Sequence, residues 1–337
     1  MTGPPAEPSP AASGASIFLL TGGTTPEGGK VPTTEIYPET GGCSVPSLRF
    51  PRHYHVTFLT AGTNPMIASC GGYGGSNTKS TCEVYNTHTR QWEEDKLGNL
   101  VTGRADHSGV TLPNIGVYLI GGNGNGKDSQ MTTEFLPACS TEWQAGPTLD
   151  VVTVNSCAVT ISSTSFLLIW KKVIRQYDAS IAGPTSNLGW LEESKWPNLQ
   201  SNREQWPGCV LLNGKVVISG GGGYSTEILD ITTRTIAQAG NMAKARRFFH
   251  TATFNLTLTE SMTVALGGYD GRQISSVEKW NPDTETWSLE TELKEPRGFF
   301  GLVALPREMI CPNYTGAFIR EELKKSKNKI FFWFCKV

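Results

Sequence analysis

The sequence predicts an all-β protein built as a six-bladed β-propeller, with four antiparallel strands in each blade. Three recurring features carry this prediction. An apolar run ending in two glycines, a hairpin of fixed internal spacing, and an arginine that opens the next apolar run follow one another along the chain. Repeated units of this kind, each holding several short strands, are typical of propeller blades.

The paired glycines give the repeat its period. Their first members are Gly22, Gly71, Gly121, Gly220 and Gly267, so the successive intervals are 49, 50, 99 and 47 residues. The interval of 99 spans two periods. It places a disguised copy at the apolar run 166–172, where Trp170 and Lys171 stand in the glycine positions. Glycine in such strands admits a close backbone approach that a side chain would prevent.

A hairpin with a fixed spacing follows the glycines. Two bulky apolar residues lie seven positions apart around its turn, in the pairs Tyr85 and Trp92, Leu136 and Trp143, Leu229 and Ile236, and Trp280 and Trp287. A glutamate precedes the first member at the recurrent positions Glu35, Glu83, Glu134, Glu227 and Glu278. Recurrence from blade to blade favours a structural role for these carboxylates, such as accepting hydrogen bonds from backbone or arginine.

An arginine followed three residues later by a histidine opens the next strand. The pairs are Arg52 and His55, Arg104 and His107, and Arg247 and His250, while Arg203 and Arg297 are followed instead by Trp206 and Phe300. With the glycine pairs and the hairpins, this pattern resembles the kelch repeat family over roughly residues 15–305. The resemblance implies one four-stranded propeller blade for each repeat.

The register of the repeats predicts how the ring closes. The chain enters in the second strand of a blade, 17–22, and its last repeat ends in a first strand, 299–305. Pairing these two segments removes both free sheet edges, which would otherwise invite aggregation. First strands are expected near residues 55, 108, 157, 209, 251 and 301, which gives six blades.

The two ends differ in composition from the repeats. Residues 1–15 are rich in Pro, Ala, Ser and Gly, and residues 306–337 are basic with an apolar end, so both are expected to lie outside the propeller of residues 16–305. The start has no secretory signal pattern, and no apolar run approaches the ~18 residues of a membrane span. We therefore expect an intracellular protein, or one whose true N-terminus is missing.

Charge and motifs argue against several functions. Twenty-nine basic and 30 acidic residues nearly cancel, so no basic field points to nucleic acid. Kelch-type copper oxidases need histidine and tyrosine ligands, but three of the five histidines here, His55, His107 and His250, occupy repeat positions. No catalytic triad, phosphate-binding loop or dinucleotide motif is present. We expect no catalytic residues, no metal and no cofactor.

The recurrent arginines are the candidate binding residues. By resemblance to kelch adaptors, Arg52, Arg104, Arg203, Arg247 and Arg297, together with Tyr73, Asn123 and Tyr269 after the glycine pairs, are expected to line a shallow bowl at the channel mouth. A guanidinium can grip a carboxylate with two hydrogen bonds, which favours an acidic protein or peptide partner. The alternative is that some of these arginines only brace the blades.

Cysteine positions leave the cellular compartment open. Cys70 precedes a glycine pair and Cys82 opens the following strand, so an antiparallel hairpin would place them opposite each other, within reach of a disulfide. Two reduced thiols are the alternative. The leading hypothesis is a non-enzymatic interaction module. A secreted or cell-surface, disulfide-supported kelch protein is the second hypothesis, and an oxidase or sugar isomerase on the same scaffold is the third.

Overall fold

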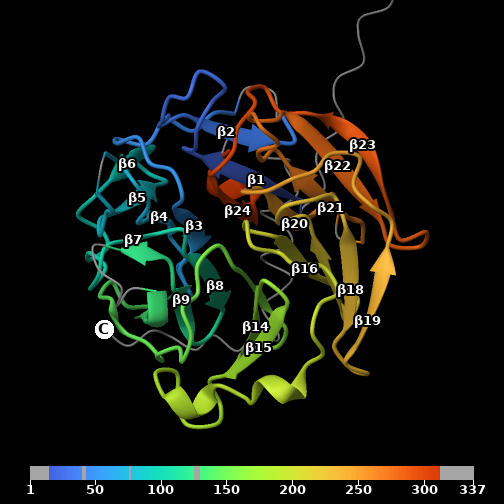
Figure 1. Cartoon of the computed structure of the whole chain (residues 1–337). Helices are drawn as coiled ribbons and strands as arrows, with labels where there is room; N and C mark the ends of the chain where they lie inside the picture. Colours follow the sequence, from blue (N-terminus) through green and yellow to red (C-terminus); the bar gives the residue numbers. More distant parts are fainter. Residues whose placement is uncertain (1–14, 40–42, 76, 125–129, 258, 312–337) are drawn as a thin grey trace, which may run out of the picture.

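The apolar runs of the sequence form strands, and the strands form antiparallel sheets arranged around a central axis (Figure 1). The computed structural model describes residues 15–39, 43–75, 77–124, 130–257 and 259–311. The expected N-terminal segment 1–15 therefore lies outside the described residues apart from Ala15, and the expected C-terminal segment lies outside them from residue 312 onwards.

Six sheets make up the six blades. Blade 1 holds β24 (Gly301–Pro306), β1 (Ser16–Thr21) and β2 (Thr34–Tyr37); blade 2 holds β3 (Val56–Leu59), β4 (Ile67–Cys70), β5 (Cys82–Asn86) and β6 (Gln91–Glu93); blade 3 holds β8 (Ser108–Leu112), β9 (Gly116–Ile120), β11 (Thr133–Pro137) and β12 (Gln144–Ala145). Blade 4 holds β13 (Cys157–Thr160), β14 (Ser165–Trp170) and β15 (Val173–Asp178); blade 5 holds β16 (Gly208–Leu212), β17 (Lys215–Ser219), β18 (Thr226–Asp230) and β19 (Thr235–Ala239); blade 6 holds β20 (His250–Asn255), β21 (Ser261–Leu266), β22 (Ser276–Asn281) and β23 (Thr286–Glu292). The predicted six-bladed antiparallel propeller is confirmed, and blades 2, 3, 5 and 6 show the four predicted strands.

Blades 1 and 4 show three strands each within the described residues. In blade 4 the outer edge of β15 is covered by a segment with two short 3₁₀ helices, η2 (Asn187–Gly189) and η3 (Glu193–Lys195). Tyr177 of β15 forms an isolated bridge with Trp190 in this segment, and the Leu191 N–H donates to the Gln176 carbonyl. The irregular segment thus takes the place of a fourth strand.

Ring closure follows the predicted pairing. β1 pairs antiparallel with β24 from Ser16 opposite Pro306 to Thr21 opposite Gly301, so the first described strand and the last one share a sheet. The described chain then continues through the 3₁₀ helix η4 (Arg307–Met309) to Ile310 and Cys311, both buried in the core. A disulfide joins Cys311 to Cys43, which follows β2. The fold therefore extends six residues beyond the expected boundary at 305.

The hairpin residues fill the space between neighbouring blades. Tyr85 and Trp92 are cross-strand partners in blade 2, their ring centroids are 5.6 Å apart, and they pack with Ile17 and Leu305 of blade 1. Trp280 is likewise paired with Trp287 in blade 6. The spacing of seven residues is therefore the spacing that puts two large side chains side by side across a hairpin.

The glycine pairs mark the points where blades meet most closely. Gly71 has a φ of 72°, and a Cβ on it would lie 2.6 Å from the carbonyl oxygen of Arg104 in the next blade. The neighbouring Gly72 N–H donates to that same carbonyl. In the disguised copy, Lys171 adopts the left-handed conformation with φ of 50°, and its N–H donates to the Arg203 carbonyl. The backbone contact is thus kept without glycine.

Candidate functional site

Four of the five arginines predicted to contact a partner are buried, which corrects that prediction. Arg52, Arg104 and Arg203 have no exposed surface, and Arg297 is 1% exposed. Each one forms an ion pair with a recurrent glutamate, so its positive charge is compensated within the propeller. A partner at the channel mouth would not reach these side chains.

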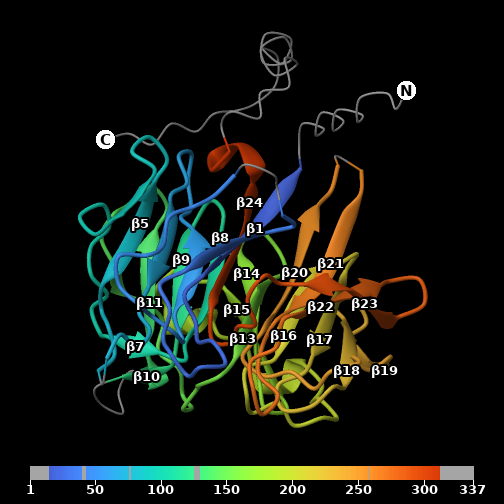
Figure 2. The same cartoon turned by 90° about the horizontal axis from the view of Figure 1, so that it is seen from above.

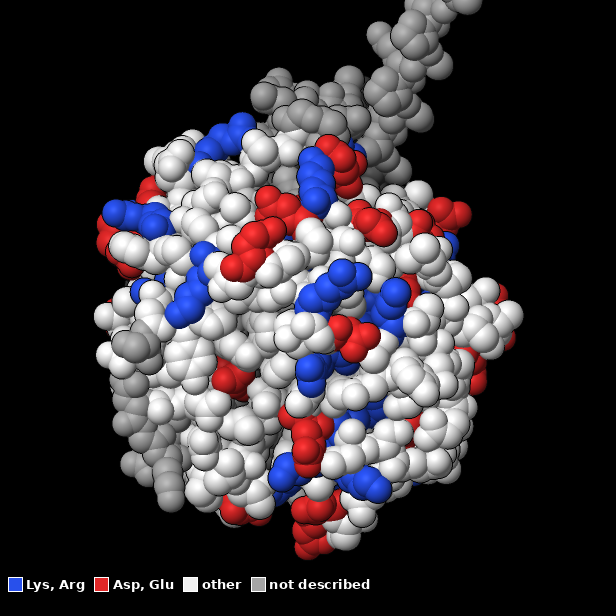
Figure 3. Space-filling model, turned by 45° about the horizontal axis from the view of Figure 1, so that its top comes forward, with Lys and Arg blue, Asp and Glu red and all other residues white. Residues whose placement is uncertain are grey.

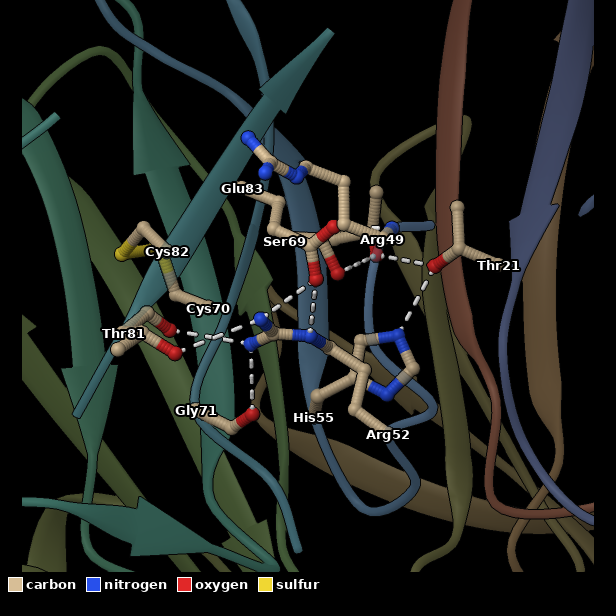
Figure 4. Close-up of polar contacts among 11 residues, drawn as sticks. Thr21, Arg49, Arg52, His55, Ser69, Cys70, Gly71, Thr81, Cys82 and Glu83 are labelled. Carbon is tan, nitrogen blue, oxygen red and sulfur yellow. Dashed lines mark hydrogen bonds and ion pairs between the residues drawn. A yellow bond between two sulfur atoms is a disulfide. The ribbon is translucent and has the colours of Figure 1, made fainter. Parts of the chain in front are cut away.

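The pair in blade 2 shows what these residues do (Figure 4). Nη2 of Arg52 lies 2.7 Å from Oε1 of Glu83, and Nη1 donates to the carbonyl oxygens of Gly71 and Thr81 at 3.0 Å each. The second oxygen of Glu83 accepts the Arg49 N–H at 2.6 Å. Burial lowers the pKa of Arg52 and the Glu83 carboxylate opposes that shift. The pair holds the loop that enters the blade.

Equivalent pairs recur around the ring. The N–O distances are 2.9 Å for Arg104 and Glu134, 2.9 Å for Arg203 and Glu227, 2.8 Å for Arg246 and Glu278, and 3.4 Å for Arg297 and Glu35. Blade 4 differs, because Thr153 stands in the arginine position and Arg175 pairs with Asp150. The recurrent glutamates thus accept arginine and backbone hydrogen bonds, as their recurrence suggested.

The predicted assignment of repeat positions in blade 6 was wrong by one residue: the recurrent arginine is Arg246, and not Arg247. Arg246 is the buried brace, and Arg247 is half-buried beside it. Correspondingly, Phe249 packs on Gly220 where His55 packs on Gly22, so His250 does not occupy the repeat position assigned to it. In blade 5 an extra residue after Arg203 puts Pro207, in place of the expected Trp206, against the second glycine of the pair.

Six residues, one before each innermost strand, form a closed backbone ring at one end of the channel. Tyr54, Asp106, Asn155, Trp206, Phe248 and Phe299 all have φ between 50° and 61°, and we call them the mouth ring. Each N–H donates to a carbonyl contributed by the preceding blade, at 2.9 to 3.4 Å. Five of these carbonyls belong to ring members, and Phe248 donates to Gln205 beside Trp206. The backbone here is held independently of the side chains.

Aromatic rings gather over this backbone. Tyr54 lies 4.5 Å from Phe299 and 5.5 Å from Phe248 between ring centroids, and Tyr73 and Tyr269 extend the group on either side. All five side chains are half-buried. We call Tyr54, Tyr73, Phe248, Tyr269 and Phe299 the mouth patch. Tyr73 and Tyr269 were predicted from the sequence. Tyr54, Phe248 and Phe299 were not, although each stands two residues after a buried arginine.

The remaining predicted residues also lie at this mouth. The Arg247 guanidinium lies 4.9 Å from the centre of the Tyr269 ring and donates to Oε1 of Gln205 at 2.7 Å. Asn123, in the short strand β10 (Asn123–Gly124) that pairs with β7 (Arg104–Ala105), donates to Oδ2 of Asp106 at 2.9 Å. Figure 2 places β7 and β10 at the end of the ring opposite η4. Arg247, Tyr73, Asn123 and Tyr269 are thus brought to one face.

The comparison with family models agrees with this architecture. The model of the Kelch motif matches residues 259–294, which include the whole of β21 to β23. This match and the six-bladed arrangement together support a kelch-repeat β-propeller. The comparison with curated proteins returned no match.

Behind the mouth the kelch ring encloses a cavity of about 220 Å³, lined by the innermost strands and by Trp206. Among the described residues, no cluster of three or more His, Cys, Asp and Glu side chains could hold a metal ion. Burial lowers the pKa of His250 to about 4 and keeps His55 and His107 neutral. The two latter imidazoles pack against the glycine pairs, which is a structural task.

On the face shown in Figure 3, the surface charges form no broad field of one sign. On the side shown in Figure 3, Lys and Arg side chains are interspersed with Asp and Glu among uncharged atoms. In the described part of the chain, no helix is long and apolar enough to cross a bilayer.

Disulfides join strands within and between the kelch blades. Cys70 and Cys82 are cross-strand partners with Cα atoms 4.1 Å apart and are bonded to each other. Cys157 of β13 is bonded to Cys209 of β16, which links the innermost strands of blades 4 and 5. No cysteine in the described residues is a free thiol. Oxidising compartments are where such bonds persist.

Proposed function

We propose that this kelch propeller is a non-enzymatic protein-interaction module whose partner binds at the channel mouth. The observation that carries the proposal is the mouth patch, five half-buried aromatic side chains grouped over one end of the ring. Exposed groups of apolar rings mark interaction surfaces on soluble proteins. Kelch propellers commonly serve as protein-interaction modules.

The mouth has the properties of a binding hot spot. Tyrosine provides a large rigid contact area with a hydroxyl at its edge, and tyrosine and arginine are enriched among the residues that dominate binding energy. Arg247 is positioned by its contacts with Tyr269 and Gln205, so little conformational freedom is lost when it contacts a partner. Of the five arginines predicted to bind, it is the one that a partner can reach.

The double variant Tyr73→Ala/Tyr269→Ala tests the proposed face. A partner isolated by affinity capture with the native protein should bind this variant more than tenfold more weakly, a loss of at least ~1.4 kcal/mol. The melting temperature should change little, because both side chains are half-exposed.

Leu289 provides the matched control for this experiment. It is 66% exposed on β23, the outermost strand of blade 6, so Leu289→Ala removes an apolar contact from the outer wall. Titration calorimetry of the captured partner against both variants separates the two surfaces. A partner that is indifferent to the double variant but loses affinity with Leu289→Ala would move the binding site to the outer edge.

The disulfides favour the second hypothesis on where the module works. We infer that the propeller acts in an oxidising compartment, as a secreted or cell-surface protein. In peptide mapping of native protein from its source, Cys70 and Cys82 should resist alkylation until a reductant is added. Full alkylation of both thiols without reductant would contradict this inference and leave the interaction proposal untouched.

A further inference from the structure

One buried carboxylate differs from all the others in the described residues. Six carboxylates are less than 9% exposed there, and five of them, the recurrent glutamates, are each paired with a buried arginine. The sixth, Asp106, is 7% exposed and forms no ion pair with any described residue. A buried charge is costly unless it is paired, so Asp106 requires an explanation.

Asp106 is a member of the mouth ring. Its N–H donates to the Tyr54 carbonyl, and its own carbonyl accepts the N–H of Asn155, the next ring member. Its carboxylate accepts one hydrogen bond, from Nδ2 of Asn123. The Oδ1 atom of Asn155 is buried and has no hydrogen-bond partner among the described residues. Two neighbouring ring positions thus carry acceptors that are not fully used.

The other ring positions are aromatic. Tyr54 lies next to Asp106 on the ring, and its side chain stacks on that of Trp206 with a centroid separation of 6.2 Å. Aromatic faces attract cations, and the attraction is larger where water is partly excluded. An anionic carboxylate, an unused amide oxygen and electron-rich rings all favour the same class of ligand.

We propose that the channel mouth receives an organic cation, the ammonium or guanidinium group of a basic side chain on the protein partner, with Asp106 as its anionic acceptor. The proposal rests on the proposed function and gives the partner's chemistry at its centre. It reverses the acidic preference expected from the arginines, because four of those arginines are neutralised within the blades. Asn155 Oδ1 accepts a second hydrogen bond from the cation, and Tyr54 offers it an aromatic face.

Protons compete with the cation for this carboxylate. Burial raises the pKa of Asp106 to about 6, and the hydrogen bond from Asn123 opposes the shift. The titratable groups that face it are Tyr54 and Tyr73, whose pKa values are raised, and the adjoining His107, which is neutral. All three stay uncharged between pH 5 and 7.5. Cation binding should therefore weaken about tenfold between pH 7.5 and pH 5, as Asp106 becomes protonated.

The probe is n-butylammonium, with 1-butanol as its uncharged counterpart, titrated into the full chain and followed by amide chemical shifts. The native protein should bind butylammonium at pH 7.5, about tenfold more weakly at pH 5, and should not respond to butanol. Asp106→Asn keeps the shape and removes the charge, so it should abolish binding. Asp270→Asn, at an exposed acid beside the mouth, should leave binding unchanged. Equal binding by Asp106→Asn, or binding that is independent of pH, would overturn the proposal.

Two further measurements locate the source of the cation. Lys127 lies outside the described residues, so the pKa of Asp106 is measured by NMR in Lys127→Met as well. The pKa of Asp106 should be the same in this variant. If it rises, the Lys127 ammonium is the cation that pairs with Asp106 in the native chain, and the proposal is wrong. The captured partner should lose more than tenfold in affinity for Asp106→Asn. A second outcome is that the partner binds Asp106→Asn as tightly as the native protein and yet fails to bind Tyr73→Ala/Tyr269→Ala. This outcome would support the channel mouth as the binding face and contradict the proposal that a basic side chain binds Asp106.

Discussion

Replacing Arg104 by methionine should destabilise the propeller by about 3–5 kcal/mol, because it leaves the Glu134 carboxylate buried without its cation. The hydrogen bonds from Arg104 to the carbonyls of Gly121 and Thr132 are lost as well. Urea unfolding followed by tryptophan fluorescence measures the change. Arg247→Met is the control, since this half-buried side chain pairs with no carboxylate among the described residues, and it should cost less than about 1 kcal/mol.

A second variant shows whether the charge pair or the lost packing is responsible. Arg104→Met/Glu134→Met removes both charges, and it should recover much of the stability lost by the single variant, since an apolar pair carries no unpaired charge. If Arg104→Met and Arg247→Met unfold at the same urea concentration, the buried pair does not brace the blade. The arginine would then have to be reconsidered as a binding residue.

The free energy of unfolding should fall as the pH decreases from 6.5 to 4, because buried histidines stay neutral in the folded state. The pKa of His250 is about 4 in the folded state because its imidazole is buried, against about 6.5 when unfolded. As the pH falls from 6.5 to 4, the unfolded chain binds a proton that the folded chain excludes, so stability present above pH 6.5 is lost. The contribution of this histidine to the pH dependence is on the order of 3 kcal/mol.

His55 and His107 act in the same direction, since burial lowers both pKa values well below the usual range. Asp106 acts in the opposite direction, because its raised pKa of about 6 makes the folded state more stable as the pH falls from 6 towards 4. Three histidines against one aspartate give a net loss. Unfolding free energies at pH 7.5, 6, 5 and 4.5 should therefore decrease. Asp106→Asn should steepen the decrease and His250→Gln should flatten it.

The exposed His88 serves as the control for this pH series, and His88→Gln should leave the profile unchanged. A stability that is constant from pH 7.5 to 4.5 would contradict the burial of neutral imidazoles.

The fold could be predicted from the sequence because the residues that recur with its period have a single, structural role. The glycine pairs, the seven-residue hairpin spacing and the start of the chain in a second strand together require six blades and the pairing of β1 with β24. The role of the arginines could not be predicted in the same way. A recurrent arginine beside a strand is compatible with a binding bowl and with an internal brace. The two are separated by the direction in which the side chain points.

The candidate site was partly hidden by local irregularities. Arg246 and Arg247 are adjacent, so the spacing to His250 selected Arg247 as the recurrent arginine, although Arg246 occupies that position. An extra residue between Arg203 and Trp206 concealed that Trp206 belongs to the mouth ring. Asp106 could not be singled out at all, because an unpaired carboxylate is recognised only once the partners of every other buried acid are known.

In the mouth ring, backbone groups join the blades, while the side chains are left to form the surface of the channel mouth. Its N–H and carbonyl groups bond one blade to the next, so the ring holds its shape whatever side chains its members carry. The requirement on each position is a left-handed backbone, which aspartate, asparagine and aromatic residues already satisfy here. Six side chains can therefore be exchanged on a frame that does not depend on them. On the binding face that we propose, single substitutions could therefore change which partner is bound without altering the blades.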